Sequence, residues 1–296
     1  MILATEGLVK RYGRHTALDG VDLAVSEGHV YGLVGPNGAG KTTLLAVLAG
    51  LRRPSAGRVR TGVPRDRLAV LPDTPQFDPW LTGREVVALA VGLASPGSPA
   101  PPPARVDEVL ADAGLAEAAG RRVGGYSRGM LQRLGIAATV VGEPALLLLD
   151  EPASALDPAG RREVLDLIAH QRGRATVVLS SHVLGDVQEV CDTIGILRAG
   201  RLLYQGPLET LLVGQAVPAY RVQLRGPVEP VIASLREEEW VDRVGLTAPG
   251  WLRVAVRSQA DAERFLAGAL ARGGARVVSL APEAPDLEDV FLELTS

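Results

Sequence analysis

The chain has 296 residues, of which 47% are hydrophobic, so it is long enough for one large domain and a smaller one. The formal net charge of −3 provides no overall attraction to nucleic acid, and the single cysteine, Cys191, excludes a disulfide within this sequence. No charged lead precedes an apolar N-terminal segment, and no apolar stretch approaches the roughly 20 residues of a membrane-spanning helix. We therefore expect a cytoplasmic protein that has no nucleic-acid partner and reaches a membrane only through another subunit.

The chain begins with short segments in which apolar and polar residues alternate. Residues 3–32 follow this pattern, with turns at Tyr12-Gly13 and Glu27-Gly28. The alternation predicts a small antiparallel sheet. It ends in the apolar run Val30–Val34, which predicts a buried strand that leads directly into the next motif.

Residues 35–43 read GPNGAGKTT and fit the pattern G-x-x-x-x-G-K-[ST] between a strand and a helix. In such a loop the backbone N–H groups surround phosphate oxygens, in conformations that a Cβ would obstruct, and the helix N-terminus adds a favourable dipole. We expect Lys41 to contact the β- and γ-phosphates and Thr42 to bind Mg²⁺. The predicted nucleotide-binding residues are Gly35, Pro36, Asn37, Gly38, Ala39, Gly40, Lys41, Thr42 and Thr43.

The middle of the chain alternates helical and strand patterns. A proline-rich connector at 95–103 separates residues 83–94 from a helical pattern at 106–119. A further helix is predicted at 131–141, and it is followed by apolar strands at 145–149 and 176–179. Strands that alternate with helices predict an α/β core.

Two acids follow the first of these apolar strands. Residues 145–152 read ALLLLDEP, which places Asp150 and Glu151 at the C-terminal end of a buried strand, beside the phosphate loop. We expect Asp150 to hold Mg²⁺. Successive side chains of a strand point to opposite faces, so Glu151 is the candidate that polarises the attacking water. The loop and the acids together predict the binding and hydrolysis of a nucleoside triphosphate.

The composition changes after residue 212, where glycines and prolines interrupt the sequence. We expect a small α+β domain there. Its predicted strands are 220–224, 251–256 and 275–280, and its predicted helices are 231–239 and 260–272. The predicted domains are accordingly 1–213 and 214–296.

With these motifs the chain resembles the ATP-binding-cassette (ABC) ATPase family over about residues 3–212. Residues 124–133, GGYSRGMLQR, resemble the family signature, which Ser127 and Gly129 match and from which Arg128 departs. The resemblance implies a P-loop NTPase cassette with a parallel-sheet core, a small antiparallel β subdomain and a helical subdomain. It also implies that Ser127, Arg128 and Gly129 bind the γ-phosphate held by a second subunit, so that each site needs two chains.

Three further segments extend the resemblance. Residues 154–157 resemble the family's subunit-contact loop, which implies that Asp157 lies at the shared nucleotide site. Residues 180–182 resemble its switch, which implies that His182 senses the γ-phosphate and is catalytic together with Lys41 and Glu151. Tyr12 stands where the family stacks an aromatic ring on adenine.

The family usually places a glutamine at a loop that reaches magnesium and touches the membrane partner. Residues 70–73, VLPD, put Asp73 at that position. The resemblance implies that Asp73 coordinates magnesium, directly or through water, and Gln76 is the competing assignment.

The signature variant YSRGM, the VLPD loop and the tail at 285–294, PDLEDVFLEL, resemble ATPase subunits of ABC-2-type exporters, including drug and antibiotic efflux systems. The tail also reads as an amphipathic terminal helix. The resemblance implies that two chains close head to tail over Mg-ATP and drive a separate transmembrane permease. The alternatives are a soluble ABC-class ATPase that acts on DNA or ribosomes, and a nucleotide-dependent dimer switch that is not coupled to transport.

Overall fold

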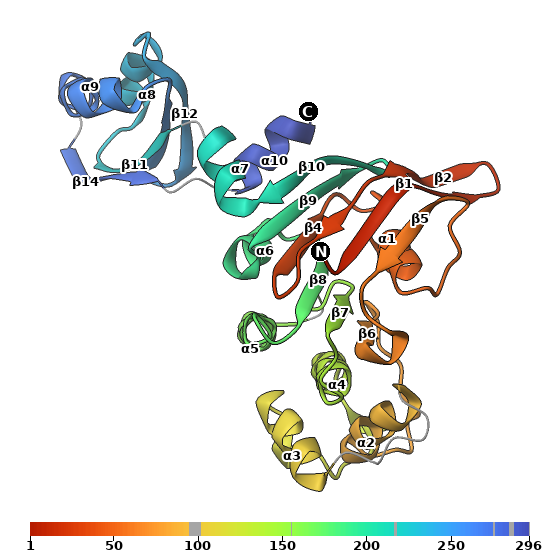
Figure 1. The fold of residues 1–296 in the computed structure, drawn as a ribbon. Coiled ribbons are helices and arrows are strands. Elements are labelled where there is room, and N and C mark those ends of the chain that lie inside the picture. Colours follow the sequence, from red (N-terminus) through yellow and green to blue (C-terminus); the bar gives the residue numbers. More distant parts are fainter. Residues whose placement is uncertain (95–101, 155, 216–217, 275, 284–286, 296) are drawn as a thin grey trace. The chain divides into compact units, whose positions relative to one another are not determined.

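A computed structural model describes residues 1–94, 102–154, 156–215, 218–274, 276–283 and 287–295. The chain divides into two compact units, a first unit of Met1–Leu208 and a second unit of Glu209–Leu294 (Figure 1). The predicted boundary between residues 213 and 214 lies within α7 (Leu208–Gln215), a few residues after this division. None of the helices in the described part of the chain combines the length and the apolar character needed to cross a membrane.

The N-terminal segments of the first unit form an antiparallel sheet, as their alternation predicts. Its strands are β1 (Leu3–Tyr12), β2 (His15–Val21), β3 (Ala24–Val25) and β5 (Ala56–Thr61). β1 pairs with each of the other three strands, and the β1–β2 turn has Gly13 at a φ of 59°. Because glycine adopts positive φ without a steric penalty, it suits this tight connection.

The second sheet of the first unit has the strand order β10-β9-β4-β8-β7-β6. The pairs among β4, β6, β7, β8 and β9 are parallel, and β10 runs antiparallel to β9. The strands are β4 (Val30–Val34), β6 (Leu68–Leu71), β7 (Leu146–Leu149), β8 (Thr176–Ser181), β9 (Thr193–Arg198) and β10 (Arg201–Pro207). All residues of β4, β7 and β8 are buried, which explains the apolar runs of β4 and β7 and that of residues 177–179 within β8.

The core of the first unit anchors the phosphate loop. One cluster of buried side chains joins the antiparallel sheet, the parallel sheet and helix α1 (Lys41–Leu48), and it includes Leu8, Leu33, Leu44 and Leu148. In the chain, helix α5 (Pro158–Ala169) precedes β8, and helix α6 (Leu184–Val190) precedes β9. Both ends of the loop are therefore attached to packed elements.

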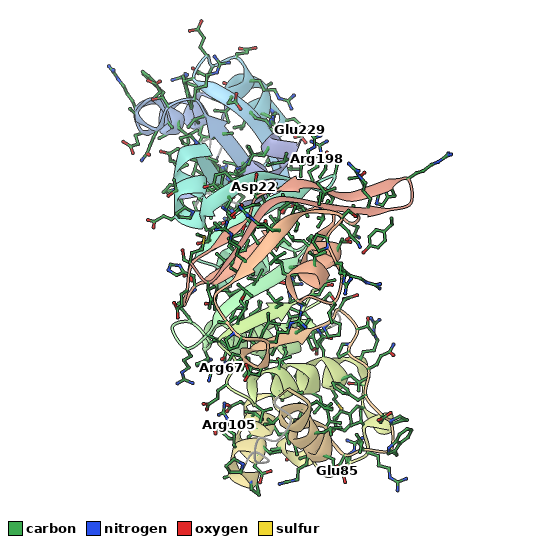
Figure 2. The ribbon with its side chains drawn as sticks, turned by 45° about the vertical axis from the view of Figure 1, so that its right-hand side comes forward. Asp22, Arg67, Glu85, Arg105, Arg198 and Glu229 are labelled. Carbon is green, nitrogen blue, oxygen red and sulfur yellow. The ribbon has the colours of Figure 1, made fainter. Side chains whose placement is uncertain are left out.

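A helical part of the first unit has its own buried cluster. It contains α2 (Gly83–Ala94), α3 (Pro103–Asp112) and α4 (Arg128–Val140), and α2 begins with a capping box. The Glu85 carboxylate accepts from the Thr82 backbone N–H at 2.7 Å, while the Thr82 hydroxyl accepts from the Glu85 N–H at 3.3 Å. The Thr82 hydroxyl also donates to the Glu85 carboxylate, at 2.8 Å. The hydrogen bonds that the Thr82 N–H and hydroxyl donate to this carboxylate lower the pKa of Glu85, which Figure 2 labels on this helical part.

Two predictions for the helical part need correction or lie outside the described residues. The helix predicted at 106–119 is interrupted, because Gly114 adopts a φ of 65° after α3, and only a short 3₁₀ turn, Ala116–Ala118, follows. An added Cβ at Gly114 would lie 2.8 Å from the Arg133 guanidinium, so this position favours glycine. Most of the predicted proline-rich connector, residues 95–101, lies outside the described residues. Two further 3₁₀ turns, Arg65–Arg67 and Val123–Gly125, precede β6 and α4.

The second unit has a four-stranded antiparallel sheet of order β12-β13-β11-β14. The strands are β11 (Ala219–Arg225), β12 (Val241–Ala248), β13 (Trp251–Val256) and β14 (Arg276–Glu283), and the helices are α8 (Glu229–Arg236), α9 (Gln259–Arg272) and α10 (Leu287–Thr295). Strand β12 was not predicted from the sequence, and only its Val241 and Val244 are buried. Residue 275, in the last predicted strand, and residues 285–286 of the tail lie outside the described residues. The rest of the tail forms α10, in which Leu287 and Val290 are buried.

The buried side chains of α8, α9 and the sheet form the core of the second unit. Leu266 of α9 is 1% exposed, so Leu266→Ala should destabilise this unit by about 2–5 kcal/mol through lost burial and a cavity. Leu246→Ala, at a 54% exposed position, is the matched control and should change stability by less than about 1 kcal/mol. The protection of β13 peptides from hydrogen exchange measures the stability of this unit in both variants. Equal loss of protection in the two variants would contradict this core.

Candidate functional site

The glycine-rich loop at 35–40 connects β4 to α1, and its glycines meet specific steric demands. A Cβ added to Gly35 would lie 2.2 Å from the carbonyl oxygen of Leu197. Gly38 and Gly40 have φ angles of 82° and 109°, which side chains rarely allow, and Gly40 is the N-cap of α1. The sequence motif therefore has its expected context, a buried strand followed by a tight loop and a helix.

Lys41 is the first residue of α1, and its side chain folds back over the loop. It is only 6% exposed. Its ammonium donates to the Gly35 carbonyl at 2.8 Å and lies 3.4 Å from Oε1 of Glu151. A compact ammonium in this position suits a point contact with phosphate oxygens that approach the loop. Among the other predicted loop residues, Pro36, Asn37, Gly38 and Thr42 are exposed, Gly40 and Thr43 are half-buried, and Gly35 and Ala39 are buried.

The parallel pairing brings the ends of three strands together. Val34 of β4 lies opposite Ser181 of β8, and Leu149 of β7 lies opposite Leu179 of β8. The residues that follow these strand ends therefore meet at one edge of the sheet, where ligands bind in open α/β sheets. This edge carries the loop and the acids of the sequence analysis.

Asp150 is 5% exposed and accepts a hydrogen bond from the Ser180 hydroxyl at 2.6 Å. Burial raises the pKa of Asp150, hydrogen bonds from Ser180 and Thr42 oppose that rise, and the charges of Asp73 and Glu151 add to it. The structure thus brings together Thr42 and Asp150, two of the predicted magnesium ligands.

No group of three or more His, Cys, Asp or Glu side chains in the described residues could hold a metal ion by itself. Mg²⁺ is commonly held by one or two carboxylates together with substrate phosphates and water. The hydroxyl of Thr42 beside the buried carboxylate of Asp150 fits that kind of site. These residues accordingly suit a metal that arrives with a nucleotide.

Glu151 has a φ of 47°, in the left-handed region that non-glycine residues seldom occupy. Its Oε1 lies 3.4 Å from the Lys41 ammonium, and its Oε2 lies 2.7 Å from Nδ1 of His182. The side chain of Glu151 is 13% exposed and that of His182 is 45% exposed. The structure therefore places the three residues predicted to be catalytic in one cluster.

Asp73 lies in the loop after β6, and its Oδ1 accepts a hydrogen bond from the Ser154 hydroxyl at 3.2 Å. Its charge contributes to the raised pKa of Asp150. Gln76, the competing assignment, is exposed, and no hydrogen bond of its side chain in the described part of the chain leads to this cluster. Asp73 is the better placed of the two.

The signature residues lie apart from the loop of the same chain. The Ser127 hydroxyl caps α4 by accepting the Met130 N–H at 3.2 Å. Ser127 and Arg128 are exposed, and Gly129 is half-buried, where an added Cβ would lie 3.1 Å from Leu156. Within the described residues, no hydrogen bond or ion pair joins these three to the phosphate loop. Ser127 and Arg128 are therefore accessible to another molecule at a helix N-terminus.

Tyr12 and Asp157 also lie outside the catalytic cluster. Tyr12 is 44% exposed at the β1–β2 turn, and the Lys10 ammonium lies 4.9 Å from the centre of its ring. Asp157 caps α5 by accepting the Gly160 N–H at 3.0 Å. Residue 155 of the predicted subunit-contact loop lies outside the described residues.

The sequence analysis assigned no role to Ser180, whose hydroxyl contacts both acids. Besides donating to Asp150, it accepts the Glu151 N–H at 2.9 Å. The predicted strand ended at Leu179, whereas β8 continues to Ser181. If the predicted strand had included residues 180 and 181, its position beside β7 would have indicated that Ser180 faces the acids.

Comparisons with known proteins found related sequences and a related fold. The profile of the family described as ABC transporter matches residues 18–154. The chain is 36% identical to the uncharacterized ABC transporter ATP-binding protein YxlF of Bacillus subtilis (strain 168), over 99% of both chains. It is 35% identical to the daunorubicin resistance ATP-binding protein DrrA3 of Streptomyces coeruleorubidus, over 99% of this chain and 95% of that one. A solved ATP-binding subunit of an ABC transporter is 29% identical with a TM-score of 0.66, and the match covers 72% of this chain and 93% of the other.

The loop geometry generates a paired test. An alanine Cβ at Gly40 would lie 2.6 Å from the Ala17 carbonyl oxygen, whereas one at Gly38 has no neighbour within 4 Å, although φ is positive at both positions. Gly40→Ala should weaken binding of a fluorescent ATP analogue about tenfold or more, because strain of this kind costs about 1–3 kcal/mol. Gly38→Ala should weaken it less. Equal affinities for the two variants would contradict this description of the loop.

Proposed function

The chain belongs to the ATP-binding proteins of ABC transporters and is an ABC-type ATPase, and from this membership we propose that it powers an ABC-2-type exporter. The proposed cargo is a drug, an antibiotic or a lipid-like molecule, since the daunorubicin resistance protein DrrA3 matches over nearly its whole length. The observation that carries the catalytic part is the Glu151 carboxylate, held between the Lys41 ammonium and the His182 imidazole.

The proposed mechanism gives each member of this cluster a role. Lys41 binds the terminal phosphates inside the glycine loop, where its charge compensates theirs. Glu151 accepts a hydrogen bond from the attacking water and orients it, and His182 contacts the γ-phosphate. Mg²⁺, held by Thr42, Asp150 and Asp73, would neutralise charge on the phosphate oxygens. Tyr12 provides a stacking surface for the adenine.

We propose that the second half of each site comes from another protomer. Ser127 stands at the N-terminus of α4, an arrangement that favours an anion, and among the described residues no hydrogen bond joins it to its own phosphate loop. Two chains arranged head to tail would each place Ser127, Arg128 and Gly129 on the γ-phosphate bound by the other, with Asp157 at the contact. ATP joins the protomers through its γ-phosphate, which ADP lacks, so hydrolysis lets them separate.

We also propose a separate transmembrane permease as partner, which would hold the chain at the inner face of the cell membrane. The loop between β6 and α2 supports this assignment, because its Trp80 is 65% exposed. Tryptophan is enriched at the centres of protein interfaces. The same loop contains Asp73 of the catalytic edge, so a partner on Trp80 would contact a segment that leads directly to the site. The second unit is proposed to be an accessory domain.

Replacing the catalytic acid tests the ATPase. Glu151→Gln should lower ATP turnover by about 10²-fold or more, because a general base contributes factors of this size, while ATP-bound dimers accumulate. Glu143→Gln is the matched control, since Glu143 also has a positive φ, 48°, but precedes β7 at its other end. Steady-state turnover and light scattering with Mg-ATP check both. Wild-type protein that dimerises on ATP without hydrolysing it would support the dimer switch instead.

Replacing the exposed tryptophan tests the transporter partner. A neighbouring gene product with about six apolar segments should co-purify with the wild-type chain from detergent-solubilised membranes. Trp80→Ser should reduce the recovered permease severalfold, because the aromatic side chain that would be buried against the permease is lost. Leu203→Ser is the control, since Leu203 is 45% exposed on β10, at the opposite edge of the sheet from β6. Equal recovery with both variants would contradict docking at this loop, and no recovery even with the wild type would favour a soluble ATPase.

A further inference from the structure

We propose that Ser180 is a positioning residue for ATP hydrolysis, whose hydroxyl sets the locations of both the magnesium-binding acid and the water-activating acid. This inference rests on the proposed function, because it assigns a role within the same site. Ser180 is fully buried, with 0% exposure, and it is the second-last residue of β8. It would touch neither the nucleotide nor the water, so its effect would pass through Asp150 and Glu151.

A single oxygen connects the two acids. Oγ of Ser180 donates its hydrogen to Oδ1 of Asp150 at 2.6 Å and accepts the backbone N–H of Glu151 at 2.9 Å. The first bond orients a carboxylate, and the second holds the peptide that joins the two acids. A hydroxyl is suited to this position because it donates and accepts at once.

The peptide after β7 is held from both neighbouring strands. On one side, the Asp150 N–H donates to the Leu71 carbonyl of β6 at 2.9 Å. On the other side, Ser180 of β8 holds the Glu151 N–H. Immediately after these two attachments the chain turns into the left-handed conformation of Glu151, with a φ of 47°. Strained backbone of this kind persists only where its surroundings determine it, and Ser180 is one of those determinants.

The turn at Glu151 directs its carboxylate toward Lys41 and His182. A change in the orientation of this peptide would move the carboxylate relative to both partners. Misplacement of a reacting group by about 1 Å can cost about 10²-fold in rate. The phosphate loop, in contrast, is attached through β4 and α1, and in the described part of the chain no side-chain hydrogen bond joins Ser180 to it. Binding of the phosphates should therefore depend on Ser180 less than hydrolysis does.

Thr176 provides a matched control within the same strand. It is also buried, at 1% exposure, and it is the first residue of β8, at the end away from the acids. Its hydroxyl accepts the Gly28 N–H at 2.9 Å. Loss of this hydroxyl should leave both acids in place.

The test compares Ser180→Ala, Ser180→Cys and Thr176→Val in the full-length protein. Alanine removes the hydrogen bonds and some volume, whereas cysteine fills the volume and is only a weak donor. We expect both Ser180 variants to lower kcat about 10- to 100-fold while KM and directly titrated affinity for a fluorescent ATP analogue change less than about threefold. Thr176→Val should keep wild-type kcat. Thermal unfolding verifies that each variant is folded, and Ser180→Cys carries the test if Ser180→Ala does not fold.

The outcomes separate this inference from the function on which it rests. A wild-type kcat in Ser180→Cys would show that Ser180 only fills space, which overturns the inference and leaves the ATPase intact. Parallel losses of kcat and nucleotide affinity would assign Ser180 a general structural role. This result would also overturn the inference and leave the ATPase assignment intact. Absence of hydrolysis by the wild-type protein would contradict the proposed function itself.

Discussion

The chemistry of this protein depends on a carboxylate held between two cationic or proton-bearing groups at the end of a parallel sheet. Glu151 lies between Lys41 and His182, and these residues follow three strands that are adjacent in space, β7, β4 and β8. Because parallel strands end at the same edge, side chains separated by over a hundred residues in sequence meet there. The buried apolar strands therefore do more than stabilise the core, since they fix the relative positions of the catalytic groups.

Sequence reasoning found the parts of the site whose chemistry restricts the residue types. Glycines at 35, 38 and 40 are required by close backbone contacts or positive φ, so the motif predicts the loop directly. It did not find the serines whose hydroxyls bond to the acids, because the sequence around a serine near a strand end does not show whether its hydroxyl faces solvent or an acid. Ser180 beside Asp150 and Ser154 beside Asp73 are of this kind.

The fold shows the same distinction. The apolar runs of β4 and β7 predict buried strands because every residue in them is covered. In contrast, only Val241 and Val244 of β12 in the second unit are buried, so this strand has no continuous apolar run. The helix predicted through Gly114 ended early for a local reason, since that residue adopts a positive φ that periodicity does not reveal. Apolar runs in the sequence therefore predict fully buried strands. They do not reveal a strand with few buried residues, such as β12, or a helix end set by the φ of one residue, such as Gly114.

The central claim is that nucleotide is bound between two protomers, each of which supplies part of the site. Mixing Lys41→Ala protein with Ser127→Arg protein tests it, because only a mixed dimer contains one site with an intact loop and an intact signature. Each variant alone should be inactive, and an equimolar mixture should regain up to about a quarter of wild-type ATP turnover, if half the dimers are mixed and each has one working site. A mixture as inactive as its components, although mixed dimers form, would contradict the claim.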